Sequence, residues 1–151
     1  GGDWLTKGMK SIEIEASPEK VFACLTDIDK LNEIAKGDVE FKQTSKGPWG
    51  VGTTMHWISK GSGQQIEADM EVTEFEKNKK VTMRTVGKSK MKVNIKYVYE
   101  PTATGTKLTK TTDYELPYSI LGKIIDKLSV RKNMEKMDEK ALRDLKKVLE
   151  T

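Results

Sequence analysis

Apolar and polar residues alternate over most of the chain before residue 115, a period typical of strands that face a core on one side and water on the other. The alternation predicts strands over residues 9–16, 38–44, 51–59, 65–76, 81–86, 91–100 and 106–114. Turn-forming residues fill the short segments between the later strands. Strands joined by such short turns pair antiparallel, so the sequence predicts an antiparallel sheet.

Two short helices are predicted between the first two strands, over residues 18–26 and 28–35. Ser17 is a suitable N-cap for the first of them, and Pro18 fits its first turn. From about Ser119 onward the apolar residues recur every three or four positions, which predicts one long helix. A helix of roughly 30 residues is about 45 Å long, enough to cover the apolar face of the sheet.

The apolar sides of these elements form one predicted layer between the sheet and the final helix. In the sheet this layer contains Met55, Trp57, Ile66, Ala68, Met70, Met83, Val93, Ile95, Tyr97, Tyr99 and Leu108. In the helix it contains Ile124, Leu128, Met134 and Met137. From the pattern alone the layer is either a packed core or the lining of a pocket, for which flexible methionines and tyrosine hydroxyls are suitable.

Composition narrows the class of protein. The chain length fits one domain over residues 1–151, with residues 1–8 expected to be a disordered or tag-derived N-terminus. One cysteine cannot form an internal disulfide, and no apolar run approaches the roughly 20 residues that span a membrane, so we expect a soluble, cytoplasmic protein. Charged residues of both signs are mixed and the net charge is only +4, which argues against a nucleic-acid partner.

Candidate residues for chemistry are few. Lys110 shares a strand face with Leu108, so its ammonium either meets a ligand carboxylate or enolate in the pocket or extends to water at the rim. His56 alternates onto the solvent face, where we expect no partner for acid–base chemistry. Cys24 lies on the packed side of the first helix and is expected to be a small buried apolar residue. Without metal-ligand spacing or a phosphate-binding glycine pattern, we expect no metal and no cofactor.

The order of predicted elements resembles that of the START-like (helix-grip) superfamily, also called the SRPBCC group. The sharpest points of resemblance, besides the long final helix, are Pro18, Glu19, Val21, Phe22, Asp27, Gly50 and Gly52. The group includes polyketide cyclase/dehydrase-like proteins, Bet v 1-like proteins and the carbon monoxide dehydrogenase G-subunit group. The resemblance covers residues 9–150 and implies an α+β fold, in which a curved antiparallel sheet of six to seven strands wraps around the C-terminal helix.

The resemblance also implies an apolar tunnel between sheet and helix, and it favours the pocket over the packed core. We therefore expect non-catalytic binding of a hydrophobic small molecule or lipid by the layer residues named above together with Lys110. The superfamily shares no catalytic residues, so none is assigned. One alternative is a polyketide cyclase/dehydrase-like enzyme. Another is a module recruited to a partner or, peripherally, to a membrane through Lys88, Lys90 and Lys92. The oligomeric state stays open.

Overall fold

The computed structural model describes residues 5–60, 65–88, 92–115 and 127–151. Its elements, in chain order, are β1 (Leu5–Ile14), α1 (Pro18–Leu25), α2 (Ile28–Ala35), β2 (Val39–Gln43), β3 (Thr54–Ser59), β4 (Ile66–Glu76), β5 (Lys80–Val86), β6 (Lys92–Pro101), β7 (Thr106–Glu115) and α4 (Lys127–Glu150). The seven strands form one sheet in the order β1-β7-β6-β5-β4-β3-β2, and every neighbouring pair is antiparallel. The predicted α+β helix-grip fold is confirmed.

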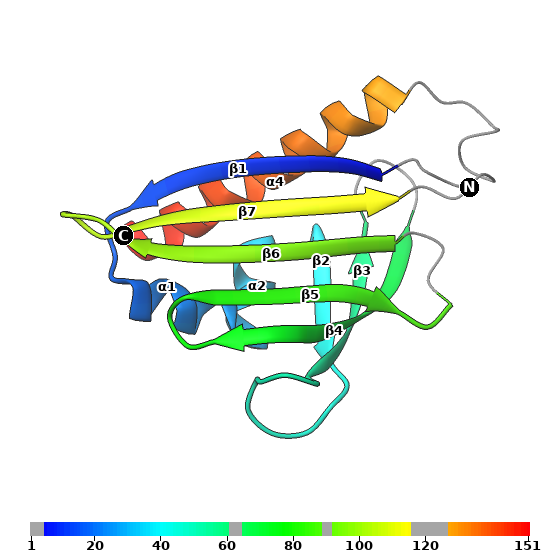
Figure 1. Ribbon diagram of the computed structural model, residues 1–151, viewed down its shortest axis with the longest axis horizontal. Helices are drawn as coiled ribbons and strands as arrows, with labels where there is room; N and C mark the ends of the chain where they lie inside the picture. Colours follow the sequence, from blue (N-terminus) through cyan, green and yellow to red (C-terminus); the bar gives the residue numbers. More distant parts are fainter. Residues whose placement is uncertain (1–4, 61–64, 89–91, 116–126) are drawn as a thin grey trace.

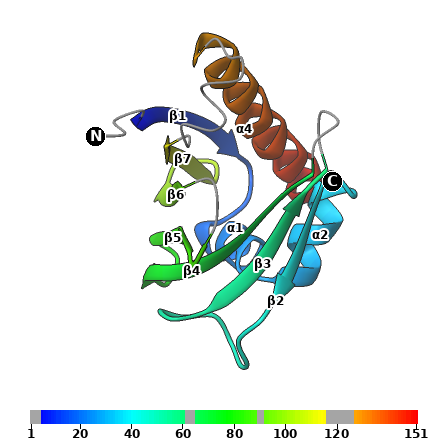
Figure 2. The same cartoon turned by 90° about the vertical axis from the view of Figure 1, so that its right-hand side faces the viewer.

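The sheet is an open arc with the helices on its concave side (Figure 1). Figure 2 looks along this arc, with α1 and α2 inside one end and α4 across the opening between the two edge strands. A register shift between Val72 and Glu74 marks an irregularity in β4, and bulges of this kind bend a strand. Because α4 crosses the opening of the arc (Figure 2), the inner face of the sheet has a helix opposite it, as a binding layer requires.

The first strand begins earlier than the sequence suggested. Residues 5–8 belong to β1 and pair with the end of β7, where Leu5 lies opposite Glu115 and Gly8 opposite Thr112. The expectation that these four residues lie outside the fold is therefore wrong, because the strand partner was not visible in a single sequence. The segment between β7 and α4, where the sequence predicted the start of the last helix, lies outside the described residues.

Capping side chains fix both short helices. The Ser17 hydroxyl accepts a hydrogen bond from the backbone N–H of Lys20 at 3.3 Å, and Pro18 occupies the first turn of α1. Asp27 plays the same role for α2, since its Oδ1 accepts from Asp29 N–H at 2.9 Å. The buried side of α1 then packs into the large apolar core.

Helix side chains also occupy backbone groups along the two edge strands. Asn32 of α2 accepts from the N–H of Phe41 at 2.8 Å and donates to its carbonyl at 2.9 Å, and these bonds cover part of the open edge of β2. Lys146 of α4 donates to the carbonyl of Glu13 in β1 at 2.7 Å. These bonds occupy polar groups that an open edge would offer to another chain, and they attach the helices to the sheet.

Within the described part of the chain, no helix has the length and apolar character needed to cross a bilayer.

Candidate functional site

The inner face of the sheet collects most of the residues that the sequence predicted for the binding layer. Strand alternation buries Met55, Ala68, Met70, Met83, Val93, Tyr99 and Leu108 on this face. The remaining inner-face members, Trp57, Ile95 and Tyr97, are only half-buried and pack against the core from its margin. Solvent therefore reaches parts of a face that already has a helix opposite it.

Two predicted members are exposed. Ile66, at the first position of β4, is 39% exposed, and Met137 of α4 is 42% exposed. Ile124 and the side chain of Leu128 fall outside the described residues, so their expected roles are not tested. The fold assembles most of the sheet part of the layer, whereas in the helix Met137 lies outside it.

The stripe of α4 that faces the sheet contains a charged residue at its centre. Asp138 is 6% exposed, and Leu142 and Leu145 continue the stripe with 4% and 1% exposure. Met134 lies one turn before Asp138 and packs against Val93 and Tyr114. The sequence pattern placed Met137 on this stripe, but the helical turn brings Asp138 there instead, because apolar spacing alone cannot identify a buried carboxylate.

Asp138 forms an ion pair with Lys110 of β7 inside the fold. The ammonium lies 2.9 Å from Oδ1, and the two side chains are 11% and 8% exposed. The hydroxyl of Thr112, two residues along β7, donates to the other carboxylate oxygen at 3.1 Å. Lys110 therefore does not extend to water at the rim, as one sequence interpretation held, but has a protein carboxylate as its partner.

The surroundings of Lys110 keep it positively charged. Burial disfavours the ammonium, but its interactions with Tyr97 and with Asp138 outweigh this cost, so the pKa of Lys110 is raised above its ordinary value. The ammonium also lies 5.7 Å from the centroid of the Tyr97 ring, within the range of a cation–π contact. Three groups from two elements, β7 and α4, thus form one buried polar cluster, Lys110, Thr112 and Asp138, beside the half-buried Tyr97.

Unlike Lys110, the Tyr99 hydroxyl on the inner face has no partner among the described residues. Tyr99 is 3% exposed, and its hydroxyl makes no hydrogen bond within the described part of the chain. Its ring packs edge-on against Phe22 of α1 at 5.3 Å, and burial raises the pKa of its phenol well above the usual value. Cys24 of the same helix is buried as expected, and burial raises the pKa of its thiol. It has the environment of an inert, packed thiol.

His56 lies on the outer face of the sheet, as alternation predicted, but it does have partners. Its Nδ1 is 2.9 Å from Asp69 Oδ1, and its Nε2 is 3.6 Å from Glu67 Oε1. The hydrogen bond to Asp69 is the main reason why the pKa of His56 is raised. The expectation of an unpartnered histidine is therefore wrong, because the β3–β4 register brings both acids beside it.

Across the described residues, no group of three or more side chains is arranged to hold a metal ion.

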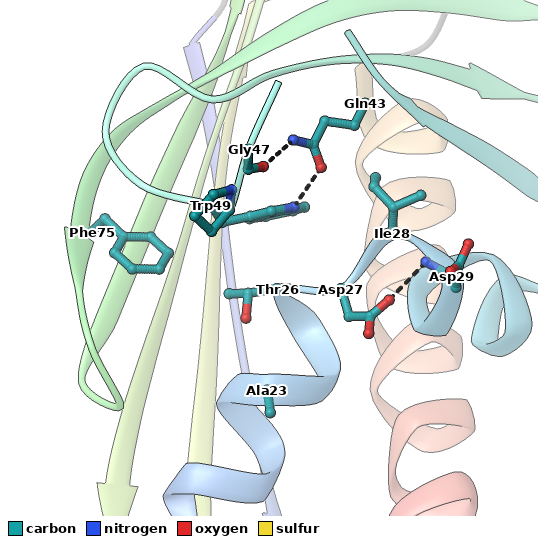
Figure 3. Close-up of a pocket in the computed structure, with 10 residues that line it drawn as sticks. Ala23, Thr26, Asp27, Ile28, Asp29, Gln43, Gly47, Trp49 and Phe75 are labelled. Atoms are coloured by element: carbon teal, nitrogen blue, oxygen red, sulfur yellow. Dashed lines mark hydrogen bonds between the residues drawn. The ribbon is translucent and has the colours of Figure 1, made fainter. Parts of the chain in front are cut away.

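A groove of about 560 Å³ lies outside the predicted layer (Figure 3). It lies between the α1–α2 junction and the segment that follows β2, and Trp49 and Phe75 contribute its aromatic surface. Gln43 shapes this segment, because it accepts from the indole N–H of Trp49 at 3.2 Å and donates to the Gly47 carbonyl at 2.8 Å. The sequence showed only a turn here, and a tryptophan within a turn was the one available signal.

The basic hairpin between β5 and β6 is only partly described. Lys88 and Lys92 are exposed, whereas Lys90 lies outside the described residues. The membrane contact expected for these lysines stays a prediction.

Comparison with known proteins identifies the family. The family model described as "Polyketide cyclase / dehydrase and lipid transport" matches residues 6–150, so the chain belongs to this family. No curated protein matches the chain.

Solved structures share the fold at low sequence identity. TTHA0849 from Thermus thermophilus is 23% identical, with a TM-score of 0.78 over 95% of this chain and 94% of that one. The di-domain ARO/CYC StfQ from the steffimycin biosynthetic pathway is 15% identical, with a TM-score of 0.76 over 97% of this chain and 51% of that one. Ara h 8.0201 is 12% identical, with a TM-score of 0.71 over 96% of this chain and 97% of that one.

Proposed function

We propose that this member of the polyketide cyclase / dehydrase and lipid transport family binds an apolar small molecule or lipid between the inner face of its sheet and α4. The observation that carries the proposal is the half-burial of Ile95 and Tyr97 on a face opposite a helix. An apolar ligand that covers these side chains gains about 25 cal/mol for each Å² of apolar surface removed from water, before ordering costs. The family assignment supports the same class of ligand.

Polar groups beside this surface would orient the ligand. The Lys110 ammonium has three N–H donors, of which Asp138 occupies one and the Tyr97 hydroxyl engages a second. The Tyr99 hydroxyl is buried without a partner in the described residues, although buried polar groups are normally hydrogen-bonded. An oxygen atom on an otherwise apolar ligand would satisfy either donor. Selectivity would therefore come from these donors, and most of the affinity from apolar contact.

We favour binding over catalysis because neither Lys110 nor Tyr99 is suited to proton transfer near neutral pH. The raised pKa of Lys110 keeps it protonated, so it is a poor base. The raised pKa of Tyr99 keeps its phenol neutral. Both oxygens of Asp138 already accept hydrogen bonds from protein groups. A cyclase-like reaction would need at least one of these groups to exchange a proton.

Two measurements test this function. Native mass spectrometry of the purified protein should detect a co-purifying small molecule, and Nile red fluorescence should report an apolar site. Ile95→Phe fills space on the inner face, whereas Val98→Phe adds bulk to the opposite face of the same strand. We expect Ile95→Phe to weaken Nile red binding about tenfold or more and Val98→Phe to leave it unchanged.

The groove beside Trp49 provides the contrasting result. If Nile red binding survives Ile95→Phe and disappears with Trp49→Ala, the ligand site is the groove beside Trp49 and the proposal is wrong. Thermal unfolding of each variant distinguishes a filled site from a damaged fold.

A further inference from the structure

The outer face of α4 carries a continuous line of positive charge. With 3.6 residues per turn, five cationic positions fall within a sector of about 80° that lies opposite the buried stripe of Asp138, Leu142 and Leu145. We call these five the basic stripe, which runs along the helix for about 22 Å. Its members are Lys132, Lys136, Lys140, Arg143 and Lys147. Figure 2 shows no other element beyond this side of α4.

The acids nearest the stripe are already engaged. Glu139 pairs with Lys10 of β1 at 2.9 Å, and Glu135 pairs with Arg131 at 3.4 Å. Asp144 pairs with Lys140 at 2.8 Å, so one member of the stripe is neutralised. The other four members form no ion pair with any described residue, although Glu139 attracts Arg143 and Lys136 at longer range, so most of their charge is available to a partner.

The chemistry of the stripe favours a diffuse anionic surface. Four of its five members are lysines, which act as flexible point charges, whereas arginine dominates where a single phosphate or carboxylate is held by two parallel bonds. The sequence of α4 contains no aromatic residue on which a nucleic-acid base could stack. A straight, convex line of lysines also lacks the concave shape of a site for a discrete anion. The headgroup plane of a membrane with anionic lipids fits all three features.

We propose that the basic stripe docks the protein on anionic membrane surfaces. Each Lys or Arg near such a surface strengthens binding about fivefold, so four available cations support weak, reversible and salt-sensitive association. The stripe lies on the side of α4 away from the sheet, so this docking does not depend on the proposed ligand site. It also involves residues other than the lysines of the β5–β6 hairpin.

Vesicle co-sedimentation of the whole protein tests the proposal with matched variants. Vesicles contain phosphatidylcholine with about 30% phosphatidylserine, or phosphatidylcholine alone, at about 0.05 M and about 0.5 M salt. The stripe variant replaces Lys132, Lys136, Arg143 and Lys147 with glutamine. The control variant replaces Lys20, Lys42, Lys79 and Lys107 with glutamine, because these lysines lie outside α4 and form no ion pair among the described residues. Both variants therefore lose four positive charges.

We expect binding only to phosphatidylserine vesicles at low salt, a loss of about 100-fold or more in the stripe variant, and a change below about fivefold in the control. An equal loss in both variants would show a net-charge effect and overturn the proposal. Absence of wild-type binding, or preferential binding to single-stranded RNA, would also overturn it. Nile red binding, measured on the same samples, should be equal in all three proteins, which separates this outcome from that of the ligand site.

Discussion

Lys110 of β7 and Asp138 of α4 join the sheet to the long helix through an ion pair of 2.9 Å, with both side chains about nine-tenths buried. The pair separates two apolar clusters. Leu108 and Leu145 belong to the larger one, and Val93 and Tyr114 to the smaller. A charged pair in this position permits one alignment of α4 along the sheet, because any axial slip would leave an uncompensated charge in the interior.

Removing one charge of this pair should lower the free energy of unfolding more than replacing both charges by apolar groups. Asp138→Leu leaves the Lys110 ammonium buried without its counter-charge, and we expect a loss of about 3–5 kcal/mol in the free energy of unfolding. The double variant Lys110→Met with Asp138→Leu replaces both charges by apolar groups and should recover most of that loss. Urea unfolding of the wild type, both single variants and the double variant measures the coupling. A double variant as unstable as the sum of the singles would contradict this account.

The comparison of sequence with structure explains why this pair was missed. Period-two alternation identified all seven strands, since a one-residue error would expose a whole face, and the capping signal at Ser17 marks the start of the first short helix. Asp138 gave no such signal, because a carboxylate in a helix is assigned to solvent unless its partner is known. That partner, Lys110, lies on another element, and only the packing of α4 on the sheet brings them together.

Local patterns do not identify partners on other elements, and this also explains the errors at pairs across strands. Alternation placed His56 on the correct face, but the identity of its neighbours Glu67 and Asp69 depends on the β3–β4 register. Half-burial at Ile95 and Tyr97 likewise depends on how far α4 stands from the sheet, which no local pattern encodes. Faces are therefore predictable from sequence, whereas contacts between faces are not.

Gly105, in the turn between β6 and β7, is required by close packing. A Cβ at this position would overlap the carbonyl oxygen of Ile14 and crowd the backbone nitrogen of Ala16 at 2.8 Å. We expect Gly105→Ala to lower the free energy of unfolding by about 3 kcal/mol, because backbone atoms cannot move aside as a flexible side chain can. Gly50→Ala is the matched control, since a Cβ there meets no atom within 4 Å.

Thermal unfolding followed by circular dichroism compares the two alanine variants. Equal melting temperatures for Gly105→Ala and Gly50→Ala would show that the β6–β7 turn tolerates a side chain and that the contact with β1 is not rigid.

Tyr99 and Thr106 carry two buried hydroxyls with opposite expectations. The Tyr99 hydroxyl has no partner among the described residues, so Tyr99→Phe should leave the free energy of unfolding of the ligand-free protein unchanged or raise it by up to about 1 kcal/mol. The Thr106 hydroxyl donates to the carbonyl of Ala16 at 2.7 Å in a fully buried position. Thr106→Val should therefore cost about 1–3 kcal/mol.

Urea unfolding of both variants tests these two expectations. A large loss in Tyr99→Phe would mean that its hydroxyl is satisfied in solution. The Tyr99 donor would then not be available to a ligand oxygen.

His56 should make the stability of the sheet depend on pH in a defined direction. Its hydrogen bond to Asp69 raises the pKa of the folded imidazole above the ordinary value of 6.5 that applies to the unfolded chain. The folded state thus retains the proton more strongly, and the resulting stabilisation is complete below about pH 6.5 and lost as the pH rises through the folded pKa. Asp69→Asn removes the main cause of the shift and should lower the pKa of His56.

An NMR titration of the His56 ring protons measures this pKa in the wild type and in Asp69→Asn. In parallel, the stability advantage of the wild type over His56→Gln should shrink as the pH rises from about 6.5 through the folded pKa of His56, because the imidazole loses its charge over that range. An advantage that grows with pH would mean that the imidazole is held in its neutral form. The Asp69 carboxylate would then accept an N–H from a neutral ring, and the two strands would be joined by a hydrogen bond without a charged histidine.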